Sequence, residues 1–266
     1  MIKNKADFEK AMSEEILDKA IPEIRRKLKG MKDQASARRL EKYWFDVNGK
    51  KRYVRINSDS FRAVSLDAEN PCGHLIRDNK EVGGKKTLKS AIDDAADKNC
   101  SNHNPGNLKS EHKIQAYIIW RALTDRQSLP ALLKITNHVD ELWFVTDELS
   151  MDSIRADIVM LGCKNNVYFP VFIELKYKRT TDVALQLKYD RLVALDVGLE
   201  FRQFLSAATG QVFNEIQMER SLLIVIWGQV NREGLKAEQM RSDHGVLTIC
   251  HSEEKDSPNE FEFSLN

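Results

Sequence analysis

The sequence contains few cysteines, and none of them are spaced as a zinc site requires. Cys72, Cys100, Cys163 and Cys250 lie far apart, with no C-x-x-C pair among them. This spacing argues against a zinc site and against a disulfide framework, and it fits the reducing cytoplasm. The 6 histidines show no metal-ligand spacing either.

Long apolar runs are absent as well. The longest uninterrupted run, residues 222–227, is far too short to span a bilayer, and residues 1–7 lack the apolar region of a signal peptide. Neither G-x-x-x-x-G-K-[ST] nor G-x-G-x-x-G occurs, so nucleotide hydrolysis has no support. The sequence therefore predicts a cytoplasmic protein without a membrane partner.

Charge is nearly balanced over the chain but is distributed unevenly. The net charge of the 266 residues is +1, whereas the stretch from Arg25 to Arg55 holds 12 basic residues against 3 acidic ones. A basic module joined to an acidic one suits a protein that binds a phosphate backbone and a catalytic cation. Solvated, charged helix faces would produce the same imbalance.

The N-terminal part reads as a helix followed by a hairpin. Residues 6–28 have apolar positions at helical spacing, with Pro22 expected to kink or divide the helix. Asn48-Gly49 joins two β-prone runs, 43–47 and 50–56, and is a strong hairpin signal. The second run places Lys51, Tyr53 and Arg55 on one face, which fits a nucleic-acid-binding ribbon or a structural hairpin with a wet face.

A loop is expected at residues 70–86 and a short helix at 88–98. Residues 99–107 are rich in Asn, Pro and Gly and give the best candidate for a domain boundary. We therefore expect a basic N-terminal region, 1–105, and a catalytic core, 106–266.

The core shows a regular alternation of elements. A helix is expected at 110–123, strands at 142–145, 156–161 and 167–178, and a second helix from 181 or 182 to 195. Residues 222–227 predict a buried, central strand, and residues 245–251 a last strand. The order α-β-β-β-α-β indicates an α/β fold, a mixed sheet flanked by helices.

One acid-x-Lys triplet has an unusual setting. The chain has four such triplets, but only Glu174-Leu175-Lys176 sits in a strongly apolar strand. The period of two residues places Glu174 and Lys176 on the same face of that strand. If Asn165-Asn166 forms a two-residue turn, counting outward along both strands places Asp157 opposite Glu174. An odd-length turn, or a bulge at Pro170, would break this pairing.

Two adjacent carboxylates repel each other unless a cation lies between them. Lys176 alone would make a structural ion pair. Alternatively, Asp157 and Glu174 are hard oxygen ligands for Mg²⁺, with water and a substrate phosphate in the remaining positions. Lys176 would then orient the attacking water or offset charge in the transition state.

Asp157 followed by Glu174-Leu175-Lys176, within an α-β-β-β-α-β order, resembles the PD-(D/E)XK nuclease superfamily, which has a restriction-endonuclease-like core. The resemblance covers residues 110–228, and Ala156 stands where the family often has Pro. It implies that Asp157 and Glu174 bind Mg²⁺ or Mn²⁺, that the Leu175 carbonyl reaches the metal, and that Lys176 is the catalytic lysine.

The resemblance implies further positions. An acid on the first core helix, here Glu111, would be a metal ligand, although a first-turn acid is also favoured by the helix dipole. Gln186 would be a catalytic residue of the helix after the E-x-K strand, but Gln186 and Tyr189 have Q-x-x-Y rather than Q-x-x-x-Y spacing. Lys178 and Arg179 are either phosphate contacts or a solvated strand end.

The sequence thus predicts metal-dependent hydrolysis of DNA phosphodiester bonds, by an endonuclease. Cutting both strands of a duplex calls for two active sites, which a homodimer would supply. A non-catalytic nucleic-acid-binding or scaffold protein of the same fold is the alternative. A second alternative is an unrelated α/β interaction protein in which the pair of Asp157 and Lys176 is structural.

Overall fold

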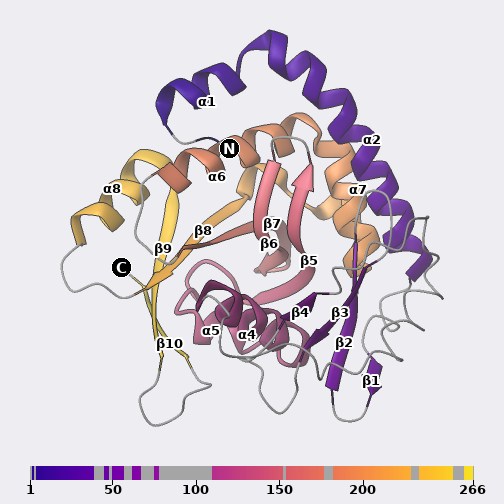
Figure 1. Cartoon of the computed structure of the whole chain (residues 1–266), viewed down its shortest axis with the longest axis vertical. Helices are drawn as coiled ribbons and strands as arrows, with labels where there is room; N and C mark the ends of the chain where they lie inside the picture. Colours follow the sequence, from indigo (N-terminus) through magenta and orange to yellow (C-terminus); the bar gives the residue numbers. More distant parts are fainter. Residues whose placement is uncertain are drawn as a thin grey trace.

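The computed structural model describes residues 2, 4–38, 45–47, 50–56, 62–66, 75–77, 110–151, 154–176, 182–228, 234–253 and 261–265. It is a mixed α/β protein with a six-stranded mixed sheet flanked by helices, and a separate four-stranded sheet, β1-β2-β3-β4 (Figure 1). The strands of the small sheet are β1 (Phe45–Val47), β2 (Lys50–Arg55), β3 (Arg62–Leu66) and β4 (Leu75–Arg77).

The six-stranded sheet has the order β10-β9-β8-β7-β6-β5. Antiparallel pairing joins β5 to β6, β6 to β7 and β9 to β10, whereas β8 runs parallel to both β7 and β9. The strands are β5 (Glu141–Met151), β6 (Ile154–Lys164), β7 (Val167–Lys176), β8 (Leu222–Gly228), β9 (Val246–Glu253) and β10 (Phe261–Leu265). The continuous apolar run of β8 is explained by this position, because helices cover both faces of an interior strand.

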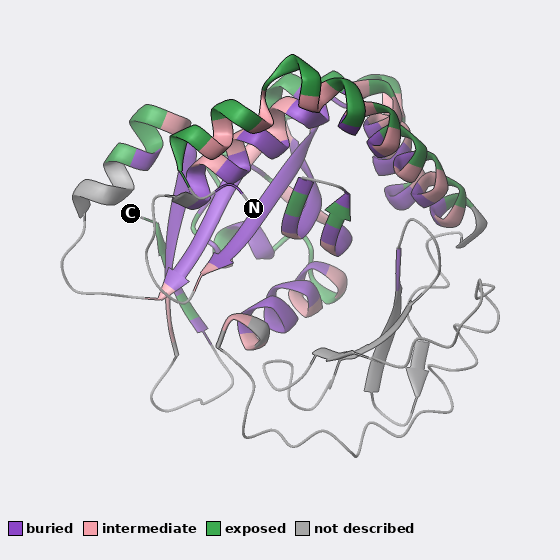
Figure 2. Ribbon diagram, turned by 45° about the horizontal axis from the view of Figure 1, so that its top comes forward, coloured by how far each residue is buried: buried purple, intermediate pink, exposed green. Residues whose placement is uncertain are grey.

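Helices cover the two faces of this sheet (Figures 1 and 2). On one face, α4 (Ser110–Thr124) and α5 (Leu129–Leu132) pack against apolar side chains such as Ile158, Met160 and Ile173. On the other face, Val159, Leu161 and Phe172 contact the core formed with α6 (Asp182–Asp196), α7 (Gly198–Thr209) and α8 (Gly234–His244). Alternate residues of β6 and β7 thus enter different cores, as the pleat of a strand requires.

The N-terminal helices pack into the second of these cores. The expected helix at 6–28 is in fact two helices, α1 (Lys5–Ala11) and α2 (Glu14–Arg38), and the break falls at Met12 and Ser13 rather than at Pro22, which lies inside α2. One stripe of α2 is buried with the sheet core: Ala20, Ile24, Leu28, Met31 and Ala35. This burial supplies the stability that lets α2 continue through its proline.

The core elements agree closely with the sequence prediction, and they extend further. The helices at 110–124 and 182–196 and all the predicted core strands are present, with β5 considerably longer than expected. Helix α7 and strand β10 were not predicted. In the N-terminal part, β1 and β2 pair as the Asn48-Gly49 signal indicates, whereas β4 lies in a stretch expected to be loop. The expected helix at 88–98 and boundary at 99–107 lie outside the described residues. None of the described helices is long and apolar enough to cross a membrane.

Candidate metal site at the end of the β6–β7 hairpin

The β6–β7 hairpin turns on two asparagines. Asn165 and Asn166 have φ values of 51° and 61°, and Lys164 pairs directly with Val167. Two successive positive φ values are characteristic of the type I′ turn, which Asn tolerates better than most residues. The predicted two-residue turn is therefore confirmed, and the pairing continues without a shift to Ile158 and Ile173.

Pro170 does not disturb this ladder. It pairs with Leu161 inside the unbroken register. Counting from the hydrogen-bonded closing pair of the turn, the Pro170 position is a non-hydrogen-bonded pair, so its nitrogen points away from β6. The neighbour on that side, β8, begins pairing only at Val171. The missing N–H of Pro170 therefore leaves no gap in the sheet.

Beyond Ile158 and Ile173, side-chain carboxylates replace the backbone ladder. The Asp157 N–H donates to Oε2 of Glu174, at 3.2 Å, and the Leu175 N–H donates to Oδ2 of Asp157, at 2.7 Å. Lys176 Nζ in turn donates to Oε1 of Glu174, at 3.1 Å. The structure thus brings together Asp157, Glu174, Leu175 and Lys176, the residues that the sequence singled out.

This carboxylate pair carries an electrostatic cost. Burial raises the pKa of Asp157, partly opposed by its hydrogen bonds and by Lys176. Burial and then the charge of Asp157 raise the pKa of Glu174 well above its ordinary value. Burial would lower the pKa of Lys176, but Glu174 and Asp157 outweigh it and raise that pKa. Both acids therefore resist ionisation, and Lys176 is held as a cation.

Helix α4 supplies two polar side chains to the same region. Gln115 is buried, and its Nε2 donates to Oε1 of Glu148, at 3.2 Å, and to the backbone carbonyl of Asp157, at 3.1 Å. Glu111, one turn earlier, is half-buried, and its charge contributes to raising the pKa of Lys176. The sequence pointed to Glu111 but not to Gln115, although the i, i+4 spacing places both on one face of the helix.

Glu148 is an acidic neighbour that sequence reasoning missed. It lies on β5 between Asp147, which pairs with Ile158, and Leu149, which pairs with Ala156. This position brings Glu148 near Asp157, and its negative charge contributes to raising the pKa of Asp157. Glu148 on β5, Asp157 on β6 and Glu174 on β7 therefore lie in one region of the sheet.

Gln186 takes part in a different buried network on α6. Its Nε2 donates to Oδ1 of Asp190, at 2.7 Å, and its Oε1 accepts the Ile2 N–H, at 3.2 Å. Asp190 also accepts a hydrogen bond from the Arg155 N–H, at 3.3 Å, and its Oδ2 has no hydrogen-bond partner among the described residues. These bonds connect Gln186 to the start of β6 and to the N-terminus rather than to the carboxylates, which favours a positioning role over the catalytic one implied by the resemblance.

Arg55 is not at the surface of the hairpin. Arg55 is 7% exposed, and its guanidinium forms a two-pronged ion pair with Asp147, which is fully buried at 0%. This placement makes Arg55 a link between β2 and β5 and does not fit the expected contact with nucleic acid. Lys51 and Tyr53 belong to β2, but their side chains lie outside the described part of the structure, as do Lys178 and Arg179.

The donor set fits a hard divalent cation only in part. Carboxylate oxygens are the ligands that Mg²⁺ prefers, and buried acids with raised pKa values are stabilised in ionised form by a cation. Across the described residues, however, no group of three or more His, Cys, Asp or Glu side chains is arranged to hold a metal ion. Asp157 and Glu174 can therefore supply two ligands, and water or a phosphate oxygen would supply the others, as is usual for Mg²⁺.

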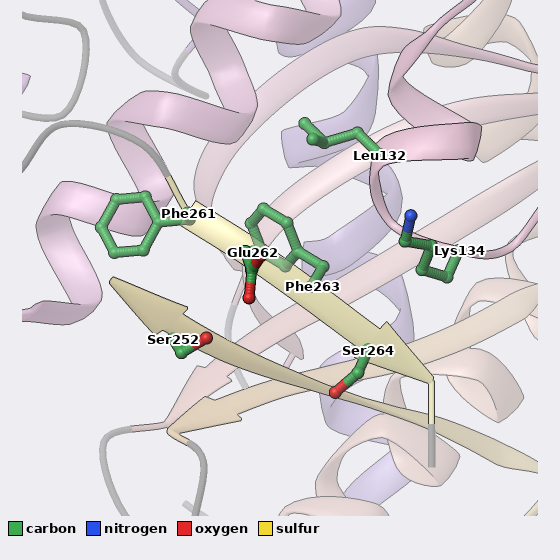
Figure 3. Close-up of a pocket in the computed structure, with 7 residues that line it drawn as sticks. All are labelled: Leu132, Lys134, Ser252, Phe261, Glu262, Phe263 and Ser264. Atoms are coloured by element: carbon green, nitrogen blue, oxygen red, sulfur yellow. The ribbon is translucent and has the colours of Figure 1, made fainter. Parts of the chain in front are cut away.

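A pocket of about 370 Å³ lies elsewhere, between the end of α5 and strand β10 (Figure 3). It is lined by Leu132, Lys134, Ser252 and residues 261–264. None of these residues belongs to the carboxylate site. Its lining combines apolar side chains with two serines, one lysine and one glutamate.

This chain matches no protein-family model, no curated protein and no solved structure. A function must therefore be inferred from the site itself.

Proposed function

We propose that this protein is a divalent-metal-dependent nuclease that hydrolyses DNA phosphodiester bonds, with Asp157, Glu174 and Lys176 as its central residues. The single observation that carries the proposal is the exchange of hydrogen bonds at the end of the β6–β7 ladder. Each carboxylate accepts a hydrogen bond from a backbone N–H of the opposite strand, and Lys176 Nζ donates a hydrogen bond to Glu174. A purely structural role would not require two buried acids side by side, because such a pair costs stability.

Each residue would have a distinct task. Asp157 and Glu174 would hold Mg²⁺ or Mn²⁺, and the Leu175 carbonyl would be a further oxygen ligand. The cation would supply Lewis acidity toward a phosphate oxygen and toward an attacking water. Lys176, held as a cation by the two acids, would donate a hydrogen bond to a phosphate oxygen and offset the negative charge that develops there.

The element order supports a distant relation to PD-(D/E)XK nucleases. Helix α4, strands β5, β6 and β7, helix α6 and strand β8 follow the α-β-β-β-α-β order expected for a restriction-endonuclease-like core. The acids lie on the second and third of these strands, where the resemblance puts them. We assign the fold to this group as a proposal.

DNA is the substrate that the charge distribution favours. The exposed side of α2 carries Arg25, Arg26 and Lys29, within the basic stretch that ends at Arg55. Some of this charge is already partnered, since Arg26 pairs with Glu23 on the same helix. Duplex cleavage would call for two such sites, so we include a homodimer in the proposal.

Cleavage of supercoiled plasmid tests the proposal. Purified protein is incubated with Mg²⁺, with Mn²⁺ and with EDTA, alongside E174Q, K176M and the control E141Q, in which a carboxylate of β5 that pairs with Arg126 is removed. We expect metal-dependent nicking by the wild type and E141Q, and a loss of at least about a hundredfold in E174Q and K176M. Nicking by E174Q at the wild-type rate would show that the site is elsewhere.

Binding without cleavage is a second candidate function. It is favoured by the hydrogen bond of 3.1 Å from Lys176 to Glu174, which already gives that acid a cationic partner, and by the lack of a group of three ligating side chains among the described residues. A gel-shift titration of duplex DNA in EDTA, with no nicking in either metal, would select this alternative.

A further inference from the structure

Glu148 is the acidic residue of the site that the E-x-K pattern does not predict. We propose that Glu148 is a third acidic residue of the site. Its carboxylate holds a water molecule of the hydrated cation beside Asp157, and Gln115 positions that carboxylate. This inference rests on the proposed function and adds to it the contribution of β5.

The register of β5 and β6 brings Glu148 to the site. Asp147 pairs with Ile158, and Leu149 pairs with Ala156, so Glu148 lies between those two pairs on β5 as Asp157 does on β6. Asp157 thereby has an acidic neighbour on each side, Glu148 on β5 and Glu174 on β7.

A β-bulge in β5 makes this register possible. Phe144 pairs with Met160, but Thr146 pairs with Val159, so Val145 is the additional residue. Bulges shift the following side chains by one position and recur beside active sites. Without it, the partner of Asp157 would be Asp147, whose carboxylate is instead committed to Arg55.

Glu148 is also held in an unusual backbone conformation. Its φ is 49°, in the left-handed region, although it is neither Gly nor Asn. Non-glycine residues in this region persist only where the surroundings fix them, and they concentrate at functional sites. The residue before Glu148 provides such a constraint, because Asp147 forms a buried ion pair with Arg55.

Gln115 links the Glu148 side chain to the strand of Asp157. One amide nitrogen of this buried residue donates both to the Glu148 carboxylate, at 3.2 Å, and to the Asp157 carbonyl, at 3.1 Å. The carboxylate of Glu148 is therefore fixed relative to Asp157 rather than left to the solvent. Such support is what turns an acidic side chain into a preorganised partner of a cation.

A water-mediated contact is the form that this partnership takes. The described carboxylates do not form a three-residue group able to hold a metal directly. Mg²⁺ gives up its water reluctantly and is usually bound through one or two carboxylates. Asp157 and Glu174 would make the direct contacts, and Glu148 would accept a hydrogen bond from a bound water.

A measurement of Mn²⁺ binding tests the inference without reference to activity. Binding is monitored through the decrease of the free Mn²⁺ signal in electron paramagnetic resonance. The wild type is compared with E148Q and with E141Q, a matched change on the same strand at a carboxylate that pairs with Arg126. We expect E148Q to weaken Mn²⁺ binding by about tenfold or more, the usual effect of removing an outer-shell partner, and E141Q to match the wild type.

A second variant, E148N, is used if E148Q does not fold. Asn adopts the left-handed region readily, so E148N keeps the backbone while removing the carboxylate, and the same loss of affinity is expected. Equal Mn²⁺ affinity in the wild type and in either folded variant overturns the inference about Glu148 and leaves the proposed function intact. No Mn²⁺ binding by the wild type overturns both.

Discussion

The carboxylate of Asp157 accepts a hydrogen bond from the backbone N–H of Leu175, with the two atoms 2.7 Å apart. In a regular ladder that N–H would be paired with the backbone of β6. A side-chain carboxylate thus replaces a backbone carbonyl of β6 as the acceptor. The two strands are joined here through the acids that the proposed chemistry needs. Stability and function therefore make opposite demands on the same two residues.

The first prediction concerns the cost of that arrangement. D157N keeps an oxygen to accept the hydrogen bond from the Leu175 N–H. It removes a buried carboxyl group whose pKa is raised by burial. In EDTA at neutral pH we expect the free energy of unfolding of D157N to equal or exceed that of the wild type, by on the order of 1 kcal/mol. Urea denaturation measures this difference.

The control for D157N is D140N. Asp140 accepts hydrogen bonds from Lys164 and from the Asn165 N–H, which hold its pKa below the ordinary value. Removing this charge is expected to lower stability, the opposite sign. A loss of stability in both variants would contradict the claim that Asp157 is held at a cost.

The second prediction concerns the link between β2 and β5. R55M leaves the fully buried carboxylate of Asp147 without its partner, and breaking a buried pair in this way costs about 3–5 kcal/mol. The exposed pair of Lys19 and Glu15 provides the control, since K19M should change stability by less than about 1 kcal/mol. Equal effects of R55M and K19M in urea denaturation would show that the link is weak.

The hairpin of the site was predictable from sequence because its determinants are local. Asn165 and Asn166 accept positive φ, the period of two residues fixes which side chains share a face, and an even turn carries that face across. Pro170 gave reason for doubt only because its pairing partner was unknown. Once Leu161 is seen opposite it, the hydrogen-bond alternation removes the conflict.

The parts that sequence could not predict depend on contacts distant in the chain. Nothing in residues 141–151 signals the bulge at Val145 or the left-handed Glu148, because both are fixed by pairing with β6 and by Arg55. Arg55 lies in the predicted strand β2, yet its partner lies 92 residues away. Charge along a strand does not reveal whether a basic side chain meets solvent or a buried acid.

The third prediction concerns packing of the β6–β7 hairpin near its turn. A Cβ added at Gly162 would lie 2.9 Å from side-chain atoms of Phe169 and Val171, and 3.2 Å from Val139. These neighbours are buried and cannot all move away. We expect G162A to lower the free energy of unfolding by about 1–3 kcal/mol, measured by urea denaturation. G198A, where the nearest atom lies at 3.8 Å, should meet no such clash.

The fourth prediction concerns pH. Burial raises the pKa of Asp190 well above 3.8, against the hydrogen bonds from Gln186 and Arg155. The folded state therefore holds the Asp190 proton more tightly than the unfolded chain does, so its contribution to stability is full below the ordinary carboxyl pKa and is lost as pH rises through the folded pKa. D190N removes this dependence, and its stability relative to the wild type should rise as the pH is raised from the ordinary carboxyl pKa toward the folded pKa. A constant difference across that range would show that Asp190 does not titrate as inferred.

The central claim is that a divalent ion binds between Asp157 and Glu174. Its most direct test is a crystal structure of the wild type soaked in Mn²⁺, read through the anomalous scattering of the metal. The account predicts a peak within coordination distance of both carboxylates, about 2.0–2.3 Å, with Lys176 displaced from Glu174. A map with no peak there, and with Lys176 still bonded to Glu174, would contradict it.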